Sequence, residues 1–254
     1  MKMREVLVVA TALAALGLAA ARGATLEAQV LEPSVMIRAG FGTGSGVVFT
    51  RGQSNYILTA AHVVAGLRTV RTRLEDGREA KYEHFEDAQV VKVLTEGARQ
   101  VGRLEMDARV LAYSDAEEGE DLALLEVRKR GFIATSGVFR ASDEPVAVGT
   151  RIYHCGSLRG EIGSNSLTDG IVSRVGRVVM GKVYDQSNAT AFPGSSGGGV
   201  FTESGDYIGM ITRGVGEGFN LFVPARRVRA WLRSIDREWM IDPSLPEPSP
   251  GDAE

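Results

Sequence analysis

The sequence predicts an all-β domain followed by one amphipathic helix, and two patterns support this. Between about residues 34 and 223, short β-branched and apolar runs are separated by glycine and polar turns, as in antiparallel β proteins. The 31 glycines of the 254-residue chain fit many tight turns and bulges. The expected strands are residues 34–38, 46–50, 55–59, 88–94, 109–114, 122–127, 151–155, 169–175, 199–202, 207–212 and 219–223.

A change in the spacing of apolar residues after Pro224 predicts the helix. Apolar residues recur there at helical spacing with arginines between them, and proline is favoured at a helix start. We expect the apolar stripe to pack on the core, with binding to a membrane surface as the alternative. The stripe consists of Val228, Trp231, Leu232, Ile235 and Trp239. Residues 242–254 hold four prolines, several acids and no base, and are expected to form a disordered tail.

Composition excludes several classes of function. A net charge of -3 without a clustered basic face argues against nucleic acid as a partner. The single cysteine, Cys155, rules out an intramolecular disulfide, and its apolar surroundings indicate a buried thiol. The three histidines are scattered along the chain at positions 62, 84 and 154, so we expect no metal site and no cofactor.

The N-terminus has the pattern of an export signal. Lys2 and Arg4 precede an apolar run over residues 6–21, and small residues allow cleavage after Ala21 or Gly23. The run is short for a membrane span, which needs about 20 residues. We expect residues 1–24 to be a signal peptide, with an uncleaved anchor as the alternative. Both imply a secreted or periplasmic protein.

Three separated motifs offer the groups that acyl transfer to a serine requires, namely a nucleophile, a base and a carboxylate that orients the base. In the segment from Tyr56 to His62, an apolar strand runs into small residues and then the histidine, which leaves room for a substrate. Asp121 heads the apolar strand Leu122-Ala-Leu-Leu, where a buried acid needs a partner, and His62 is the natural one. Asp115 and Glu120 compete with it but lie in a charged loop.

The third motif is Phe192-Pro-Gly-Ser-Ser196-Gly-Gly-Gly. A serine between glycines, followed by an apolar strand, suits a tight turn. The backbone N–H groups of Gly194 and Ser196 could converge there on one oxyanion. A flexible turn has the same composition, but the preceding proline and the following strand favour a rigid one.

Together these motifs resemble those of the trypsin-like serine proteases, most closely the HtrA-like bacterial branch. That family has Thr-Ala-Ala-His, then Asp-Leu-Ala-Leu-Leu or a close variant, then Gly-Asn-Ser-Gly-Gly, in this order. Three further segments are similar to the family's: the strand from Gly42 to Phe49, Asp169-Gly-Ile-Val-Ser173, and Phe219 to Pro224 before the helix. The resemblance defines a protease domain over residues 34–238.

The resemblance implies two six-stranded antiparallel β-barrels with the active site between them. It implies His62 as base and then acid, Asp121 as its orienting group, and Ser196 as nucleophile. Gly194 and Ser196 would supply the oxyanion hole. Thr190, Thr212 and Gly214 would bind substrate: Thr190 near the base of the specificity pocket, Thr212 with its hydroxyl near the aspartate, and Gly214 along the substrate backbone. Part of the segment Gly216 to Leu221 would also line the pocket. Because no acid occupies the base position, we expect a small to medium apolar side chain rather than Lys or Arg.

The chain departs from the family in several places. Ser195 stands where relatives carry Asn or Asp, so the choice of Ser196 as nucleophile rests on the glycines that follow it. Without an aspartate at 195, activation through a newly cut N-terminus is not expected. No PDZ-sized segment follows Trp239, and residues 69–120 are expected to carry variable loops.

We therefore expect a serine endopeptidase acting on proteins or peptides. The main alternative is a catalytically silent protease-fold protein that binds partners. An esterase on another fold is a third interpretation, but Gly44-Ser45-Gly46 precedes a strand rather than the helix that a nucleophile elbow requires. The sequence does not determine the oligomeric state.

Overall fold

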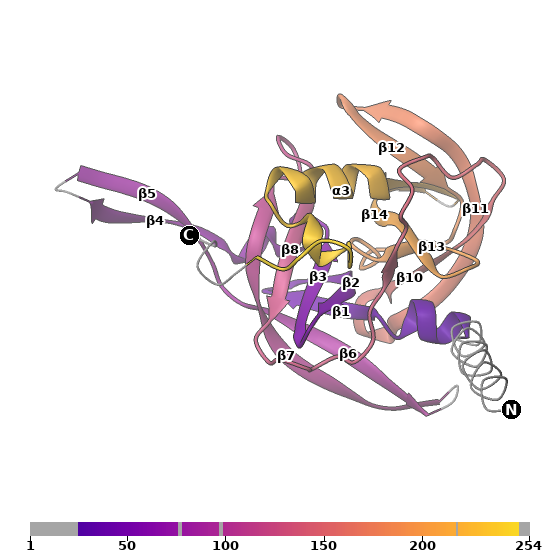
Figure 1. Cartoon of the computed structure of the whole chain (residues 1–254), viewed down its shortest axis with the longest axis horizontal. Helices are drawn as coiled ribbons and strands as arrows, with labels where there is room; N and C mark the ends of the chain where they lie inside the picture. Colours follow the sequence, from indigo (N-terminus) through magenta and orange to yellow (C-terminus); the bar gives the residue numbers. More distant parts are fainter. Residues whose placement is uncertain (1–24, 76–77, 97–98, 217, 249–254) are drawn as a thin grey trace, which may run out of the picture.

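The computed structural model describes residues 25–75, 78–96, 99–216 and 218–248, and consists mainly of antiparallel strands (Figure 1). The expected signal peptide or anchor, residues 1–24, lies outside the described residues. The strands are β1 (Ser34–Ala39), β2 (Gly42–Arg51), β3 (Ser54–Thr59), β4 (Arg68–Glu75), β5 (Arg78–Phe85), β6 (Ala88–Glu96), β7 (Arg99–Ser114), β8 (Leu122–Val127), β9 (Val138–Phe139), β10 (Arg151–Leu158), β11 (Gly163–Val179), β12 (Lys182–Ser187), β13 (Gly199–Thr202), β14 (Asp206–Gly216) and β15 (Phe219–Pro224). The helices are η1 (Glu27–Leu31), α2 (Ala61–Val64), η2 (Ala65–Leu67), η3 (Gly160–Ile162), α3 (Ala225–Ser234) and η4 (Glu238–Met240).

Six strands close the first barrel in the order β1-β2-β3-β8-β7-β6, each pair antiparallel. Aliphatic side chains on both faces of its strands are buried, and Ile57, Leu58 and Leu124 are at most 1% exposed. Strand β8 is buried along nearly its whole length. This burial explains the continuous apolar run that follows Asp121.

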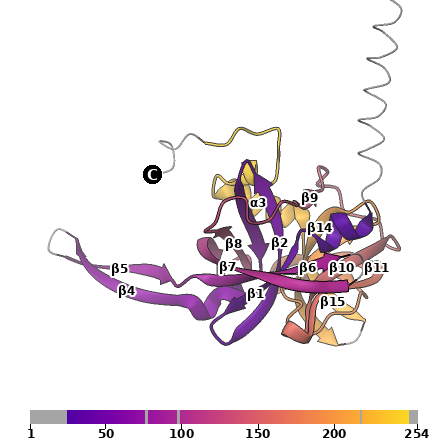
Figure 2. The ribbon, with the colours of Figure 1, turned by 90° about the horizontal axis from the view of Figure 1, so that it is seen from below.

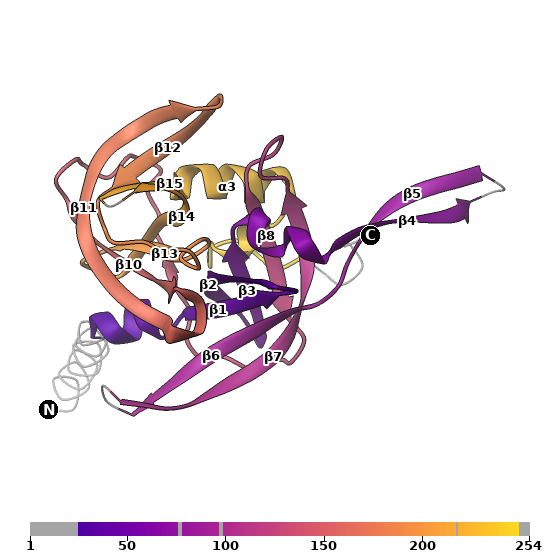
Figure 3. The ribbon, with the colours of Figure 1, turned by 180° about the vertical axis from the view of Figure 1, so that it is seen from behind.

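The second barrel runs β13-β10-β11-β12-β15-β14 and closes through an additional β13–β14 pairing. The prediction of two six-stranded antiparallel barrels is therefore confirmed. The two-residue strand β9 adds a parallel edge to β14. Figure 3 shows the long β11 curving around one side of this barrel. Cys155 on β10 is fully buried, as expected, and burial raises the pKa of its thiol to about 12.

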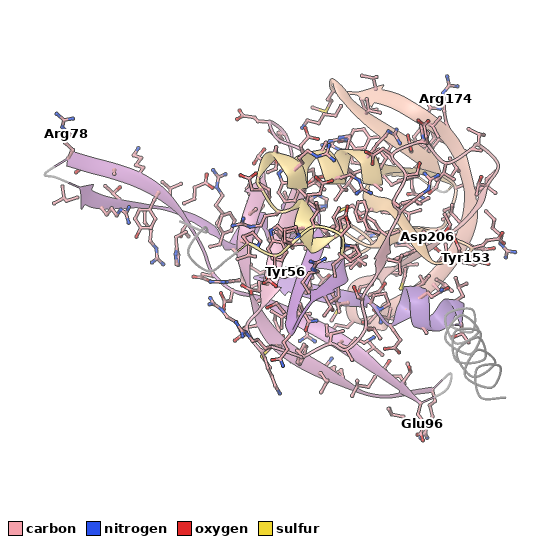
Figure 4. The ribbon with its side chains drawn as sticks, viewed as in Figure 1. Tyr56, Arg78, Glu96, Tyr153, Arg174 and Asp206 are labelled. Carbon is pink, nitrogen blue, oxygen red and sulfur yellow. The ribbon has the colours of Figure 1, made fainter. Side chains whose placement is uncertain are left out.

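Residues 69–120, expected to carry variable loops around strands 88–94 and 109–114, form two long hairpins, of which β4–β5 was not predicted. Strands β4 and β5 pair only with each other and project away from both barrels (Figure 2). Figure 4 places Arg78 at the far end of this hairpin and Glu96 near the end of the β6–β7 hairpin. Val70 and Leu74 are 61% and 74% exposed. A strand with no buried face has no hydrophobic alternation, so its sequence does not distinguish it from a loop.

The C-terminal helix has the predicted amphipathic character and faces the core. Val228, Trp231 and Leu232 are buried, as is Arg229, whose Nε donates to the Asp143 carboxylate at 2.9 Å. The helix α3 ends at Ser234, earlier than the apolar periodicity suggests. Trp239 lies in η4 instead, where its ring packs edge-on against a β3 tyrosine at 5.5 Å.

The tail expected to be disordered is described only as far as residue 248. In this part, the Arg51 guanidinium donates to the carbonyls of Asp242 and Leu245 at 2.9 and 2.8 Å, which holds the chain beside β2. Residues 249–254 lie outside the described part. Within residues 25–248, apart from the short gaps, no helix has both the length and the apolar character needed to cross a membrane.

A fully buried histidine on β10 should make stability depend on pH. His154 contacts the Gly199 carbonyl at 3.0 Å through Nδ1, and burial lowers its pKa from 6.5 to about 4. Between these values the unfolded chain binds a proton that the native protein does not. The free energy of unfolding should therefore fall by roughly 1 kcal/mol per pH unit from this residue as pH drops from 6.5 towards 4.

The variant His154→Asn tests this expectation, because its amide cannot take up the proton. Urea titrations at several pH values should show a shallower loss of stability than wild type, whatever the cost of the substitution at neutral pH. His84→Asn on the projecting hairpin is the matched control. An unchanged pH slope in His154→Asn would contradict the assignment.

Candidate active site

His62 lies at the junction between a buried strand and one turn of helix. Strand β3 is buried up to Thr59, whose hydroxyl donates to the Ser45 carbonyl at 2.7 Å. Ala60 is extended, and α2 starts at Ala61. The neighbours of His62 in this turn are buried, whereas its own side chain is 37% exposed. The small residues before it thus leave the imidazole at the surface of the cleft.

Asp121 is buried and bonded to His62. It sits just before β8 with a left-handed backbone, φ 57°, a conformation that aspartate tolerates better than most residues. Its carboxylate accepts the His62 backbone N–H at 3.1 Å, and both of its oxygens lie 3.0 Å from Nδ1. Because an ionised carboxylate only accepts, Nδ1 carries the proton. Nε2 is then free to accept one.

The two competing acids are engaged elsewhere. Glu120 accepts the Arg227 Nε–H at 2.9 Å. Asp115 accepts the backbone N–H groups of Glu117 and Glu118, and these bonds hold the pKa of its carboxyl below the ordinary value. Asp121 is therefore the acid that contacts the imidazole.

Two consecutive turns shape the backbone around Ser196. In the first, Ser195 N–H donates to the Phe192 carbonyl at 2.8 Å, with proline second and Gly194 third at φ 95°. In the second, Gly198 N–H donates to the Ser195 carbonyl at 2.9 Å, with Ser196 second and glycine 197 third at φ 83°. Both have the features of type II turns, which require glycine at the third position.

These turns dock onto the first barrel through Ser45, which sequence analysis considered only as the serine of an esterase elbow. Its backbone N–H donates to the Ser196 carbonyl at 2.8 Å, and its hydroxyl donates to the Gly194 carbonyl at 2.7 Å. The same hydroxyl accepts the Ser157 N–H at 2.7 Å. Only its place in the segment Gly42 to Phe49 signals a role. Ser45 joins the serine turn to both barrels.

Close backbone packing brings the serine turn to the histidine segment. A Cβ on Gly197 would lie 2.2 Å from the Ser45 carbonyl oxygen and 3.0 Å from the Ala60 nitrogen, so no side chain fits there. Gly197 thus contacts the residues just before His62. Among the described residues, no hydrogen bond joins the Ser196 hydroxyl to the imidazole. Such bonds are often long in free enzymes and tighten with substrate.

The backbone N–H groups of Gly194 and Ser196 are the predicted oxyanion donors. Neither donates to an acceptor within the described part of the chain. Their neighbours are fixed: the Pro193 carbonyl accepts the Arg159 N–H at 2.8 Å, and the Arg159 guanidinium stacks on the Phe192 ring at 4.9 Å. The donors are therefore held in place before any ligand binds.

A cavity of about 390 Å³ opens beside Ser196. Thr212 and Gly214, both predicted to bind substrate, line it. The hydroxyl of Thr212 is buried and makes no hydrogen bond to any residue that the structure describes. It therefore does not bond to Asp121. Thr190 is exposed and is not among the lining residues, and its carbonyl accepts the Thr168 hydroxyl at 2.8 Å. The full lining is Ala191, Phe192, Pro193, Ser195, Ser196, Ile211, Thr212, Gly214 and Asn220.

Asn220 is a polar lining residue within the segment Gly216 to Leu221, part of which was expected to line the pocket, although no residue of that segment was singled out. It is 1% exposed, and its Nδ2 donates to the Ala189 carbonyl at 2.7 Å. In the sequence it is one polar residue in an apolar strand, Phe219-Asn-Leu-Phe, and that interruption was the available signal. In the described residues, no cluster of three or more His, Cys, Asp or Glu side chains could hold a metal ion.

Comparison with known proteins places the chain in a family. A model described as a trypsin-like peptidase domain matches residues 44–210. A probable periplasmic serine protease, do/HhoA-like, from Haemophilus influenzae is 28% identical over 67% of this chain and 30% of its own length. A probable periplasmic serine endoprotease, DegP-like, from Halomonas elongata is 30% identical over 78% of this chain and 37% of its own. The chain spans about a third of the length of these relatives.

Solved structures agree on the fold. Rv3671c from M. tuberculosis, in an inactive form, matches with a TM-score of 0.60 and 19% identity over 84% of this chain and 91% of that one. The HtrA-type protease AlgW, solved with a tripeptide, matches with a TM-score of 0.61 and 18% identity over 87% and 64%. Both share the double-barrel architecture. On the domain match and these relatives, the chain belongs to the trypsin-like peptidase family, in its HtrA-like branch.

Proposed function

We propose that this protein is a serine endopeptidase that hydrolyses peptide bonds through His62, Asp121 and Ser196. The observation that carries the proposal is the buried carboxylate bonded to His62 Nδ1, 3.0 Å away, beside a rigid serine turn. Family membership supports the same activity.

The proposed mechanism uses atoms of His62, Gly194 and Ser196 that make no hydrogen bond to the described residues. Nε2 of His62 takes the proton of the Ser196 hydroxyl as its oxygen attacks the scissile carbonyl carbon. The backbone N–H groups of Gly194 and Ser196 stabilise the oxyanion of the tetrahedral intermediate. Protonated His62, stabilised by Asp121, then gives the proton to the leaving amine, and an acyl ester remains on Ser196. Water, activated by the same imidazole, hydrolyses this ester. The proposal requires no cofactor and no metal.

Protein or peptide substrates fit the exposed edge of the cleft. Gly214 is exposed on β14 and has no side chain, so an extended substrate backbone could lie beside it. Because the curated relatives are described as periplasmic, and residues 1–24 have the pattern of a signal peptide, we place the activity in the periplasm or outside the cell.

A second candidate is a catalytically silent protein that binds partners. Two observations favour it: the unusual Ser195 before the nucleophile, and the absence of a described hydrogen bond between Ser196 and His62. In that case wild type would bind peptides without turning them over.

Labelling with a fluorophosphonate probe separates these functions. Wild-type protein should become labelled, and peptide mapping should place the adduct on Ser196, because only an activated serine reacts readily. Ser196→Ala should remain unlabelled. Ser204→Ala, which changes an exposed serine in the β13–β14 turn, should label like wild type. Folded wild type that stays unlabelled would favour the silent alternative.

A further inference from the structure

Two residues that line the cavity beside Ser196 each carry a buried polar atom without a partner. The Oδ1 of Asn220 and the Oγ1 of Thr212 make no hydrogen bond to any described residue. Their residues are only 1% and 5% exposed. A buried polar group without a partner destabilises the free protein, so a ligand that supplies the partner gains affinity.

The geometry determines which way the Asn220 amide points. Its nitrogen must face the Ala189 carbonyl, 2.7 Å away, because a carbonyl oxygen can only accept. The oxygen therefore lies on the other side of the amide. There it would be 3.0 Å from a Cβ placed on Gly214, the residue paired with Asn220 across β14 and β15. The unpaired acceptor lies beside the wall that Gly214 leaves without a side chain.

The two atoms are chemically complementary to a carboxamide. An amide oxygen only accepts, whereas a threonine hydroxyl can also donate. A carboxamide offers N–H donors to the first and a carbonyl acceptor to the second. The remaining wall is largely apolar, from Ala191, Phe192 and Ile211, and suits the methylene groups of a side chain. No described lining residue is ionisable, so a charged side chain would be buried there without a counterion.

We propose that Asn220 is a specificity-determining residue and that, together with Thr212, it selects substrates with glutamine or asparagine before the scissile bond. This rests on the proposed function, and it replaces the apolar preference expected from the sequence. An apolar side chain would fill the same cavity but leave both polar atoms unpaired. A site built to hydrogen-bond a substrate discriminates strongly against analogues that lack the matching group.

The test is a set of fluorogenic peptides that differ only at the residue before the scissile bond. Glutamine and methionine form the matched pair, because they have similar length but only glutamine bears the amide. For wild type we expect kcat/KM to be about 10- to 100-fold higher with glutamine than with methionine. Glutamate, lysine and leucine complete the set. A faster rate with any of these or with methionine would overturn the proposal.

Two variants assign the preference to the named atoms. Asn220→Leu keeps the volume but removes the acceptor, and should bring the glutamine to methionine ratio close to one. Thr212→Val removes the hydroxyl alone and should lower the ratio partway. An unchanged ratio in folded Asn220→Leu would refute the role of Asn220. Should that variant fail to fold, the wild-type series still decides the substrate class.

Phosphonate labelling of Ser196 in the same samples keeps the two proposals apart. Labelled protein without a glutamine or asparagine preference overturns this inference and leaves the endopeptidase proposal standing. Protein that neither labels nor cleaves any peptide of the set overturns both.

Discussion

Ser196→Ala should lower kcat for peptide hydrolysis by about 10⁴- to 10⁶-fold, because the attacking oxygen is removed. The substitution should not disturb the fold. Ser196 occupies the second position of its turn, where alanine is tolerated, and its structural bond to Ser45 N–H uses the backbone carbonyl. The residual rate should come from the oxyanion donors and substrate binding alone.

This prediction separates catalysis from binding. Progress curves with the preferred peptide give kcat, and fluorescence anisotropy of the same peptide gives its affinity for the variant. We expect affinity within a few-fold of wild type, since the backbone N–H groups of Gly194 and residue 196 remain. A variant that keeps more than about a tenth of the wild-type kcat would exclude Ser196 as the nucleophile.

Asp121→Asn should lower kcat by about 10⁴-fold with little change in structure. Asparagine has the same shape and also tolerates the left-handed backbone at this position, φ 57°. Its oxygen can keep the bond to the His62 backbone N–H, but its NH₂ group then faces Nδ1. The ring must accept that hydrogen bond and carry its own proton on Nε2. The imidazole can then no longer take the proton of Ser196.

Steady-state kinetics at several pH values and thermal denaturation provide the measurements. The Tm should stay near that of wild type while kcat falls. Asp115→Asn is the matched control, because Asp115 is an acid of the same loop whose carboxylate bonds to backbone N–H groups rather than to the imidazole. A tenfold or smaller loss of kcat in Asp121→Asn would mean that this carboxylate does not orient the base.

Sequence patterns were sufficient to predict strands and helices wherever burial produces a periodic or continuous run of apolar residues. The strands around Ile57 and Leu124 face a packed interior, so their positions could be predicted from apolar residues alone. The apolar stripe on α3 could be predicted from the sequence for the same reason. The β4–β5 hairpin could not be predicted in this way. Both of its faces contact water, so its sequence has no alternation of buried apolar and exposed polar residues.

The chain by itself determined the candidate chemistry: a histidine after small residues, an aspartate heading an apolar strand, and a serine among glycines. The need of a buried acid for a partner also pointed from Asp121 to His62, and the structure shows that bond. Only the tertiary structure decided that Ser45 ties the serine turn to both barrels and that Asn220 is the residue of β15 that lines the cavity. The hydrogen bonds of Ser45 join residues 112 and 149 positions apart, and such contacts depend on how the two barrels pack and on which way single amides and hydroxyls point. Neither property has a periodicity along the chain, and so neither can be predicted from sequence patterns.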